Sequence, residues 1–406
     1  MKNEIKTNRT LFLIILGLLS AIGPFSIDTY IPGFPSIAKD LDVTVSEVSY
    51  SLASFFIGIS LGQLIYGPLL DRFGRKTPLM IGMVIYILAS VGCALANSLE
   101  ILIALRFLQA IGGCVGMIAP RAIVRDSFKV EESAKIFSTL TLILGVSPII
   151  APTIGSYMIS AYGWHSVFWL QATAGLLLLL SVKFLIPESR VADETISLHP
   201  NYIIPTFWRI FRNPQFFTYA FTGSLLLGSI HAYVSGSPLV FMTIFKATEK
   251  EYGWIFGLLA GTIIFSSQLN NFALRKYKSE KIVQNALRIQ LIFGLILVST
   301  SLLGWLNIYN AIILLMLFFS CQGFSFPNIT ALSLAPFKKE AGSASALMGA
   351  LQMGVGALAA AMVGFFSNGT SLPMMGVLAT CSVSAFLIFV LGKFIIKKKT
   401  FPLSND

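Results

Sequence analysis

Long apolar runs alternate with short polar segments along the whole chain, and this alternation limits the possible folds more than any other feature. Each run is close to the roughly 20 residues that a helix needs to cross the hydrocarbon core of a bilayer. A chain in lipid must satisfy its backbone polar groups internally, so such runs are predicted to be helices. The runs lie at about 11–33, 46–70, 78–97, 99–122, 136–161, 164–186, 214–241, 249–273, 284–306, 308–332, 342–366 and 372–396. The sequence therefore predicts an all-α integral membrane protein with twelve transmembrane helices.

Composition supports a membrane protein and argues against a nucleic-acid-binding one. Of the 406 residues, 55% are hydrophobic and only 12% are charged, which is not the profile of a soluble domain. The net charge of +11 would suit a nucleic-acid partner. However, the basic residues lie in the short loops between apolar runs, where they determine membrane orientation. We therefore expect the lipid bilayer, and no nucleic acid, as a partner.

Lysines and arginines gather in alternate loops, which predicts the orientation of the chain. The basic loops contain the N-terminal bases, Arg72/Arg75/Lys76, Arg121/Arg125/Lys129/Lys135, Arg190/Arg209/Arg212, Arg275/Lys276/Lys278/Lys281, Lys338/Lys339 and Lys397/Lys398/Lys399. The other loops contain only Lys39, Lys246 and Lys250. Because basic loops stay in the cytoplasm, both termini are predicted to be cytoplasmic. An even number of helices agrees with this orientation.

The longest polar interruption, at 187–213, divides the chain near its midpoint. We expect an N-terminal six-helix half at 1–188, a cytoplasmic linker at 189–213 and a C-terminal six-helix half at 214–406. Gly112 and Gly116 in the first half are echoed at the same spacing by Gly323 and Pro327 in the second. Two such halves occur in transporters built from parallel repeats, although this internal similarity is weak.

A ten-residue loop, G-P-L-L-D-R-F-G-R-K at 67–76, concentrates charge between two apolar runs. Its bases are expected among lipid headgroups on the cytoplasmic side. Asp71 is expected either to pair locally or to approach the positive N-terminus of a helix, such as the start of the 342–366 run, with Arg125 as an added partner. Thr77 and Pro78 are expected to cap and open the next helix. The simpler alternative is a basic turn that only fixes topology.

Two ionisable residues, Asp28 and Arg106, lie inside apolar runs. An ionised side chain at bilayer depth costs about 2.5–3.5 kcal/mol or more, so such residues usually line a wet cavity or have a partner. One interpretation is a proton-coupling pair: desolvation favours a neutral carboxyl, a nearby cation opposes this, and the arginine remains charged. The alternatives are a static buried ion pair and side chains that reach an interface.

Other polar and aromatic residues in the runs are candidates for a substrate cavity. His231 is as readily a hydrogen-bonded packing residue as a proton relay. Amides could contact a substrate or join helices, and aromatic rings could offer a flat surface to a lipophilic ligand. The candidates are Tyr30, Gln109, His231, Tyr233, Gln322, Phe326, Asn328 and Gln352.

Small residues recur every four positions in the 136–161 run, with prolines beside them. The small side chains allow a neighbouring backbone to approach, and the prolines favour a bend, which suits either pivoting or static packing. The residues are Ser147, Pro148, Ala151, Pro152 and Gly155.

The sequence shows no pattern typical of an enzyme or a metal site. The four cysteines, Cys93, Cys114, Cys321 and Cys381, all fall inside apolar runs and lack metal-ligand spacing. No nucleophile lies next to a base, and no glycine-rich phosphate loop occurs. We expect no metal, no cofactor and no catalytic activity.

Several of these stretches together resemble a known family. The 67–76 loop resembles the signature loop of the major facilitator superfamily. Together with four further stretches, this loop makes the chain similar to twelve-helix drug:proton antiporters of the bicyclomycin- and chloramphenicol-resistance (Bcr/CflA) subfamily. The stretches are I-D-T-Y-I-P at 27–32, the segment of the 99–122 run that starts R-F-L-Q-A-I-G-G at 106, S-P-I-I-A-P-T-I-G-S at 147–156 followed by G-W at 163–164, and A-G-S-A-S-A-L-M-G-A-L-Q at 341–352. Ser156 and His165 depart from the residues common at those positions in relatives.

The resemblance implies a monomeric, multi-pass exporter in the bacterial inner membrane that exchanges small amphipathic substrates for protons by alternating access. It implies that Asp28 carries the proton and that Arg106 tunes it. It also implies that the loop forms a cytoplasmic latch from Gly67, Asp71, Arg72, Gly74, Arg75, Lys76 and Arg125. The alternatives are an exporter of a specific metabolite such as an amino acid, and a proton-coupled uptake symporter, against which the 147–156 stretch argues.

Overall fold

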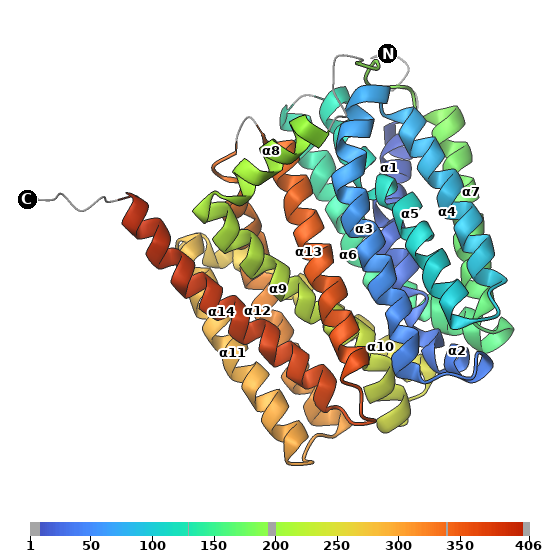
Figure 1. Cartoon of the computed structure of the whole chain (residues 1–406), viewed down its shortest axis with the longest axis vertical. Coiled ribbons are helices and arrows are strands. Elements are labelled where there is room, and N and C mark those ends of the chain that lie inside the picture. Colours follow the sequence, from blue (N-terminus) through green and yellow to red (C-terminus); the bar gives the residue numbers. More distant parts are fainter. Residues whose placement is uncertain (1–8, 129, 194–199, 338–339, 401–406) are drawn as a thin grey trace, which may run out of the picture. The chain divides into compact units, whose positions relative to one another are not determined.

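The computed structural model describes residues 9–128, 130–193, 200–337 and 340–400. All regular secondary structure in these ranges is helical (Figure 1). Twelve of the helical segments there are long and apolar enough to cross a membrane. The predicted all-α membrane fold with twelve spans is therefore confirmed.

The chain divides into two compact units, one formed by Met1–His199 with Thr248–Gly257 and the other by Pro200–Ala247 with Leu258–Asp406. In the first unit, α5 packs against α3 and α4, α4 packs against α7, and α1 packs against α5 and α6. Its helices are α1 (Arg9–Asp28), η2 (Ile31–Gly33), α2 (Phe34–Asp40), α3 (Val45–Phe73), α4 (Lys76–Ala94), α5 (Leu99–Ser127), α6 (Val130–Tyr162) and α7 (His165–Leu185).

In the second unit, α9 packs against α12, α13 and α14, and α11 packs against α12 and α14. The helices after the chain midpoint are α8 (Pro200–Phe211), α9 (Pro214–Ser237), η3 (Pro238–Ile244), α10 (Glu249–Ala273), α11 (Ser279–Leu302), α12 (Ile308–Leu334), α13 (Ala341–Phe365) and α14 (Leu372–Thr400). Helix α8 lies inside the segment that the sequence predicts only as a polar linker. This helix has only 12 residues and contains Pro205, so the hydropathy of the segment did not indicate a helix.

Side-chain caps determine where several helices begin. Thr44 accepts a hydrogen bond from the Glu47 backbone N–H while the Glu47 carboxylate accepts one from Thr44, which is a capping box. Ser98 caps α5, Asn213 caps α9, and Asn307 caps α12. These caps satisfy backbone N–H groups that the first turn of each helix leaves without a partner.

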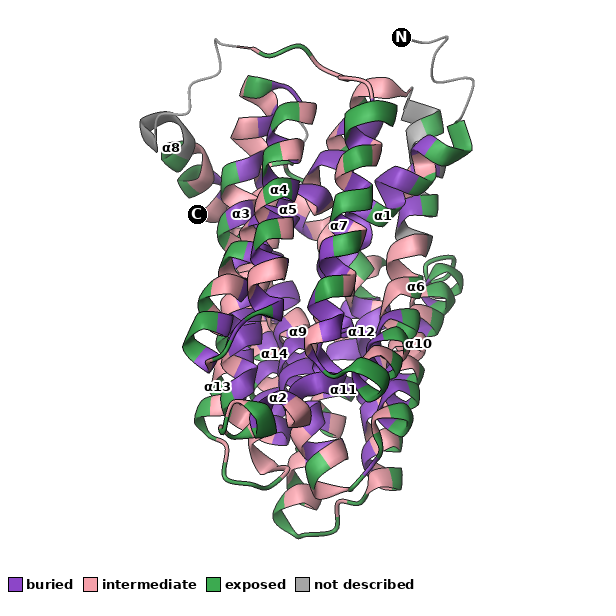
Figure 2. Ribbon diagram, turned by 90° about the vertical axis from the view of Figure 1, so that its right-hand side faces the viewer, coloured by how far each residue is buried: buried purple, intermediate pink, exposed green. Residues whose placement is uncertain are grey.

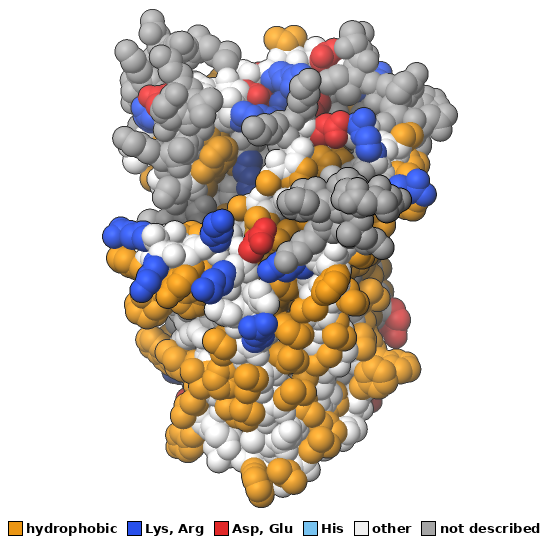
Figure 3. Space-filling view, turned by 90° about the vertical axis from the view of Figure 1, so that its left-hand side faces the viewer, with side chains coloured by type: hydrophobic (Ala, Val, Ile, Leu, Met, Phe, Trp, Pro, Cys, Tyr) orange, Lys and Arg blue, Asp and Glu red, His pale blue; other side chains and the backbone are white. Residues whose placement is uncertain are grey.

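Buried residues line the helix faces that meet within each unit, whereas exposed residues cover the outer faces (Figure 2). On the face shown in Figure 3, hydrophobic side chains form a continuous field, and lysines and arginines gather along one edge of it. A large apolar exterior with basic residues at its margin is the surface expected of a protein embedded in lipid.

The first predicted span is interrupted in the structure. Helix α1 ends at Asp28, and the chain continues through the short helices η2 and α2 rather than as one helix to residue 33. Pro32 and Pro35 lack a backbone N–H, which removes donors that a continuous helix would need here. The break places Asp28 at a helix end inside the first unit.

Candidate functional site

Asp28 is the last residue of α1 and is buried, with 6% of its surface exposed. Among the described residues, its carboxyl group makes no hydrogen bond or ion pair within the usual distance limits. The neighbouring hydroxyls are used locally, since Ser26 Oγ donates to the Ile22 carbonyl at 2.6 Å and Thr29 Oγ1 donates to the Phe25 carbonyl at 2.7 Å. Asp28 is thus a buried acid without a hydrogen-bond partner in the described part of the chain.

Arg106 in α5 is fully buried, at 0% exposure. Its Nη1 donates to Gln109 Oε1 at 2.7 Å and to the Ser26 carbonyl at 3.3 Å. Its guanidinium carbon lies 4.1 Å from the Phe55 ring centre and 4.6 Å from that of Tyr30. In the part of the chain that the structure describes, Nε and Nη2 of Arg106 have no hydrogen-bond partner.

Arg106 therefore does not form the static ion pair with Asp28 that remained one interpretation of the sequence. The aromatic faces of Phe55 and Tyr30 attract the cation, but they compensate only part of the cost of burying it. Its two remaining donors could bind a further acceptor. The charge stays fixed because a guanidinium does not lose its proton in proteins.

Gln171 in α7 joins Arg106 to the segment that carries Asp28. Gln109 Nε2 donates to Gln171 Oε1 at 2.7 Å, and Gln171 Nε2 donates to Thr29 Oγ1 at 2.9 Å and to the Ser26 carbonyl at 3.3 Å. Ser26 of α1 and Thr29, the first residue after α1, flank Asp28. Sequence reasoning missed Gln171, although it is the only carboxamide in its apolar run and that feature could have identified it.

Other polar contacts complete this buried cluster in the first unit. Gln109 also donates to Ser90 Oγ at 2.7 Å, and the hydroxyls of Ser26 and Tyr86 lie 2.7 Å apart. The Tyr30 hydroxyl lies 2.8 Å from Ser51 Oγ. Five helices, α1, α3, α4, α5 and α7, thus contribute polar side chains to this cluster around Arg106.

Two amide candidates of the second half join α12 to neighbouring helices. Gln322 Nε2 donates to Ser229 Oγ at 2.6 Å and to the Leu226 carbonyl at 3.1 Å, so it joins α12 to α9. Asn328 Nδ2 donates to Asn270 Oδ1 at 2.8 Å, which joins α12 to α10. In the structure, these two amides join helices.

The remaining candidates of the second half pack within the unit. His231 is buried at Gly356 of α13, where a Cβ atom would lie 2.5 Å from His231 Nδ1. The Tyr233 ring lies 5.3 Å from that of Phe319. Gln352 is buried, and Phe326 is half-buried.

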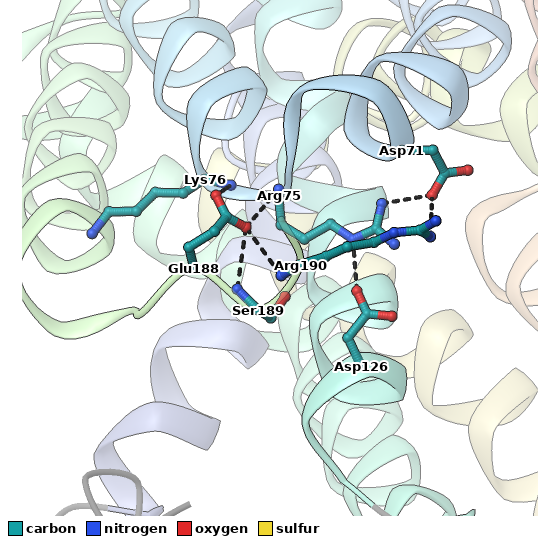
Figure 4. A network of polar contacts seen from close by, with 7 residues as sticks. All are labelled: Asp71, Arg75, Lys76, Asp126, Glu188, Ser189 and Arg190. Carbon is teal, nitrogen blue, oxygen red and sulfur yellow. Dashed lines mark hydrogen bonds and ion pairs between the residues drawn. The ribbon is translucent and has the colours of Figure 1, made fainter. Parts of the chain in front are cut away.

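The charged loop after α3 forms a network of ion pairs around Arg75, which is only 1% exposed (Figure 4). Arg75 Nη1 binds Asp71 Oδ1 at 2.7 Å, and Arg75 Nε binds Asp126 Oδ2 at 2.7 Å. Arg190, from the segment after α7, binds the same Asp71 oxygen at 3.1 Å. Burial lowers the pKa of the Arg75 guanidinium, but the hydrogen bonds to Asp126 and Asp71 outweigh it and raise the pKa above its ordinary value.

Glu188 caps the start of α4, because its carboxylate accepts hydrogen bonds from the backbone N–H groups of Arg75 at 2.8 Å and Lys76 at 3.0 Å (Figure 4). The prediction that Thr77 caps this helix is wrong: α4 begins at Lys76, and a carboxylate distant in sequence supplies the cap. Gly74 allows this approach, since its φ is +81° and a Cβ atom there would lie 2.9 Å from Glu188 Oε2.

The predicted latch residues therefore divide into those inside this network and those outside it. Asp71, Gly74, Arg75 and Lys76 lie inside. The Arg72 side chain lies against the Phe73 ring, and a Cβ atom at Gly67 would meet nothing within 4 Å. The Arg125 side chain is exposed, and among the described residues it is the neighbouring Asp126 that pairs with the loop.

The small-residue motif in α6 packs against the site. A Cβ atom at Gly155 would collide with the Thr29 carbonyl oxygen, so only glycine allows α6 to approach the end of α1 this closely. Ala151 is buried, and Pro148 and Pro152 lie inside the helix. The motif thus positions the backbone beside Asp28.

Comparison with known proteins identifies the class. The family model described as Major Facilitator Superfamily matches residues 16–361, so the chain belongs to this superfamily of membrane transporters. The chain is 32% identical to the "Bicyclomycin resistance protein homolog" of Haemophilus influenzae over 93% of this chain and 95% of that protein. It is also 32% identical to "Multidrug resistance protein MdtL" of Escherichia coli, over 93% and 95% of the two chains. These relatives confirm the resemblance to the bicyclomycin- and chloramphenicol-resistance subfamily.

Two solved structures share the fold. They are inward-facing structures of a bacterial homolog of the human lysosomal transporter Spinster, one unoccupied and one occupied. The unoccupied structure aligns with a TM-score of 0.71 at 14% identity over 95% of both chains, and the occupied one with a TM-score of 0.70 at 13% identity over 97% of both. At this identity the likeness concerns the fold alone.

Proposed function

We propose that this protein exports small amphipathic compounds, antibiotics among them, from the bacterial cytoplasm in exchange for protons. The observation that carries the proposal is the buried Asp28, which lies at a helix break, has no partner among the described residues and is close in sequence to the Ser26 carbonyl that Arg106 binds. An acid in this situation can take up and release a proton as its surroundings change. The names of the resistance relatives support a drug-like cargo.

In this mechanism, Asp28 binds a proton when the site opens to the periplasm and releases it when the site opens to the cytoplasm. Arg106 remains charged throughout, and its contact and that of Gln171 with the residues beside Asp28 link uptake of substrate to loss of the proton. Gln109 and Gln171 fix the position of Arg106 relative to α1 by hydrogen bonds.

In the same proposal, the two six-helix halves, 1–188 and 214–406, expose the site alternately to the two sides of the membrane. Segment 189–213 is the linker between them, and the loop network is the latch. The protein works as a monomer with both termini in the cytoplasm, and it is not an enzyme.

Inverted membrane vesicles test this proposal. A growth-inhibition panel in a host that lacks its own exporters first selects a compound to which the protein gives resistance. Uptake of that compound into inverted vesicles should then require an imposed pH gradient, acidic inside, and should stop when the gradient is collapsed. Uptake that persists without the gradient would exclude proton antiport.

The same vesicles distinguish the alternatives. An exporter of a specific metabolite would move one compound, such as an amino acid, and would ignore the rest of the panel. A proton-coupled uptake symporter would release a preloaded compound from the inverted vesicles together with protons instead of accumulating it.

A further inference from the structure

A second arginine of α5, Arg121, lies within a membrane-spanning helix and takes no part in the site or in the loop network. Its side chain is exposed, and it makes no ion pair or hydrogen bond with the residues whose positions are described. Helix α5 ends at Ser127, so Arg121 lies about 9 Å along the axis from that end at 1.5 Å per residue. The acid closest to it along α5, Asp126, is already paired with Arg75.

Arg121 lines an open cavity of about 300 Å³ whose described lining residues all belong to the first unit. The described lining residues are Ser20 of α1, Arg121 of α5, and Phe137, Leu140 and Leu144 of α6. Arg121 carries the only charge among them. Ser20 already donates its hydroxyl to the Leu16 carbonyl at 2.8 Å, so among the described lining residues one cation faces three apolar side chains. The volume is at the lower end of the range for small-molecule sites.

The positions of the lining residues along their helices show how far the cavity extends into the membrane-spanning region. Ser20 lies about 16 Å along α1 from its first residue, Arg9, so the cavity extends beyond the ends of the helices into the membrane-spanning region. A guanidinium there that has no acidic partner among the described residues can bind a carboxylate or phosphate through charge-assisted hydrogen bonds, and its planar fork suits two acceptor oxygens. Phe137, Leu140 and Leu144 would gain by burying an apolar body.

We propose that this cavity binds an amphipathic organic anion, with its anionic group on Arg121 and its apolar body against Phe137, Leu140 and Leu144. The proposal rests on the export function and extends it by naming a substrate class. A soluble organic acid and an anionic lipid share the required chemistry. The cavity would hold such a molecule on the α1, α5 and α6 side of the first unit.

Three compounds with one ring system test the charge requirement. Purified protein in phosphatidylcholine nanodiscs is titrated calorimetrically with 1-naphthoate, 1-naphthylmethanol and 1-naphthylmethylammonium. We expect the anion to bind about tenfold more tightly than the alcohol, since a charged hydrogen bond contributes about 1.5 kcal/mol or more, and the cation to bind more weakly still. Equal affinities for the anion and the alcohol would overturn the proposal.

Variants locate the binding. Arg121→Gln should remove the preference for naphthoate, and Arg121→Lys should retain part of it because the charge remains. Lys183→Gln removes the same charge from the C-terminal end of α7, outside the cavity lining, and should leave the preference intact. Leu144→Trp should fill the cavity and weaken binding of both naphthoate and naphthylmethanol. If Arg121→Gln binds naphthoate as tightly as the parent protein, the assignment is wrong.

Lipid composition separates the two sources of the anion. When phosphatidylglycerol is added to the nanodiscs, competition that raises the Kd for naphthoate in the parent but not in Arg121→Gln identifies a lipid headgroup as the occupant. An unchanged Kd in the parent identifies a soluble anion. These equilibrium titrations need no proton gradient, so their outcome is independent of whether the vesicle assay supports proton-coupled export.

Discussion

Arg106 keeps its charge in the interior of the first unit without an acidic partner among the described residues, which is unusual at the scale of single residues. Its contacts are carbonyl oxygen, amide oxygen and aromatic faces, all of which are neutral. A neutral shell leaves the field of the cation available to a substrate. Such an arrangement is costly for stability alone, which favours a functional reason for it.

The first prediction concerns the proton on Asp28. Asp28→Asn preserves size and removes the titrating group, so addition of substrate to the purified protein should no longer release protons. Gradient-driven uptake into inverted vesicles, which corresponds to efflux from the cell, should fall to background. The protein should still reach the membrane because a neutral amide is less costly to insert than an acid. A pH electrode in weakly buffered solution measures the release.

Asp42→Asn is the matched control for this experiment. Asp42 lies outside the helices with φ of 53°, a conformation that asparagine also adopts readily, so this change should leave proton release and efflux intact. Normal gradient-driven efflux by Asp28→Asn would show that another group carries the proton.

The second prediction concerns Gln171, which connects Gln109 to α1. Gln171→Leu removes the hydrogen bonds that Gln171 donates to Ser26 and Thr29 and the one that it accepts from Gln109, and it leaves buried groups without partners. We expect a loss of about 1–3 kcal/mol in unfolding free energy and an efflux rate roughly tenfold lower. Thermal unfolding and vesicle uptake measure the two effects.

The chain offers a matched control in Gln290. This glutamine is also fully buried, but its amide nitrogen and oxygen have no hydrogen-bond partner among the described residues. Gln290→Leu should therefore be neutral or stabilising, since it removes polar atoms that gain nothing from burial. If the two variants behave alike, the Gln171 bridge has no special role.

At the scale of elements, the loop after α3 is held by three other segments: the start of α4, the end of α5 and the residues that follow α7. Asp126 supplies one carboxylate to Arg75, and Glu188 caps α4. Because Arg75 is buried, its charge is stabilised by its two carboxylate partners, Asp71 and Asp126. The loop is thus a tertiary junction within the first unit and more than a basic turn that fixes topology.

The third prediction tests this junction. Asp126→Asn leaves the buried Arg75 with Asp71 as its single carboxylate partner, and we expect it to destabilise the protein by about 3 kcal/mol, as for other broken buried pairs. Glu132→Gln breaks the exposed pair with Arg9 at 3.7 Å and should cost less than about 1 kcal/mol. Thermal unfolding in detergent compares them. Equal small effects would show that solvent screens the Arg75 pairs.

The sequence allowed prediction of the twelve spans and of the loop motif, because hydropathy and clustered charge are local signals. It did not predict the break after Asp28 or helix α8, since a proline-containing apolar run and a short amphipathic helix resemble their alternatives. Gln171, Asp126 and Glu188 were also missed as partners. Their contacts join positions far apart in the chain, and a single sequence contains no direct record of such pairing.

The α6 motif was also only partly predictable from the sequence. Its four-residue spacing predicted close packing, but the partner of Gly155, the Thr29 carbonyl next to Asp28, became clear only in the fold.

The four cysteines are buried free thiols, as their place in apolar runs suggested: Cys93, Cys114, Cys321 and Cys381. Among the described residues, no cluster of three or more His, Cys, Asp or Glu residues could hold a metal ion.

At the scale of the whole molecule, the alternation of basic and non-basic loops predicts a single orientation in the membrane. The loops after α3 and α7 carry Arg72, Arg75 and Arg190, whereas the loop between α4 and α5 carries no lysine or arginine. Each basic residue resists transfer across the membrane, so the first set should stay in the cytoplasm. The loop network around Arg75 would then face the cytoplasm, as a latch in the export cycle requires.

Fusions to reporters test this orientation as the fourth prediction. Alkaline phosphatase, active only in the periplasm, should be active when fused after Asn97 and inactive when fused after Arg190 or at the C-terminus, where green fluorescent protein should instead be fluorescent. Replacing Arg72, Arg75 and Lys76 together by glutamine removes the strongest local signal, yet the remaining basic loops should keep the C-terminus in the cytoplasm. Phosphatase activity at the C-terminus of the otherwise unaltered chain would reverse the orientation, and with it the direction of the proposed transport.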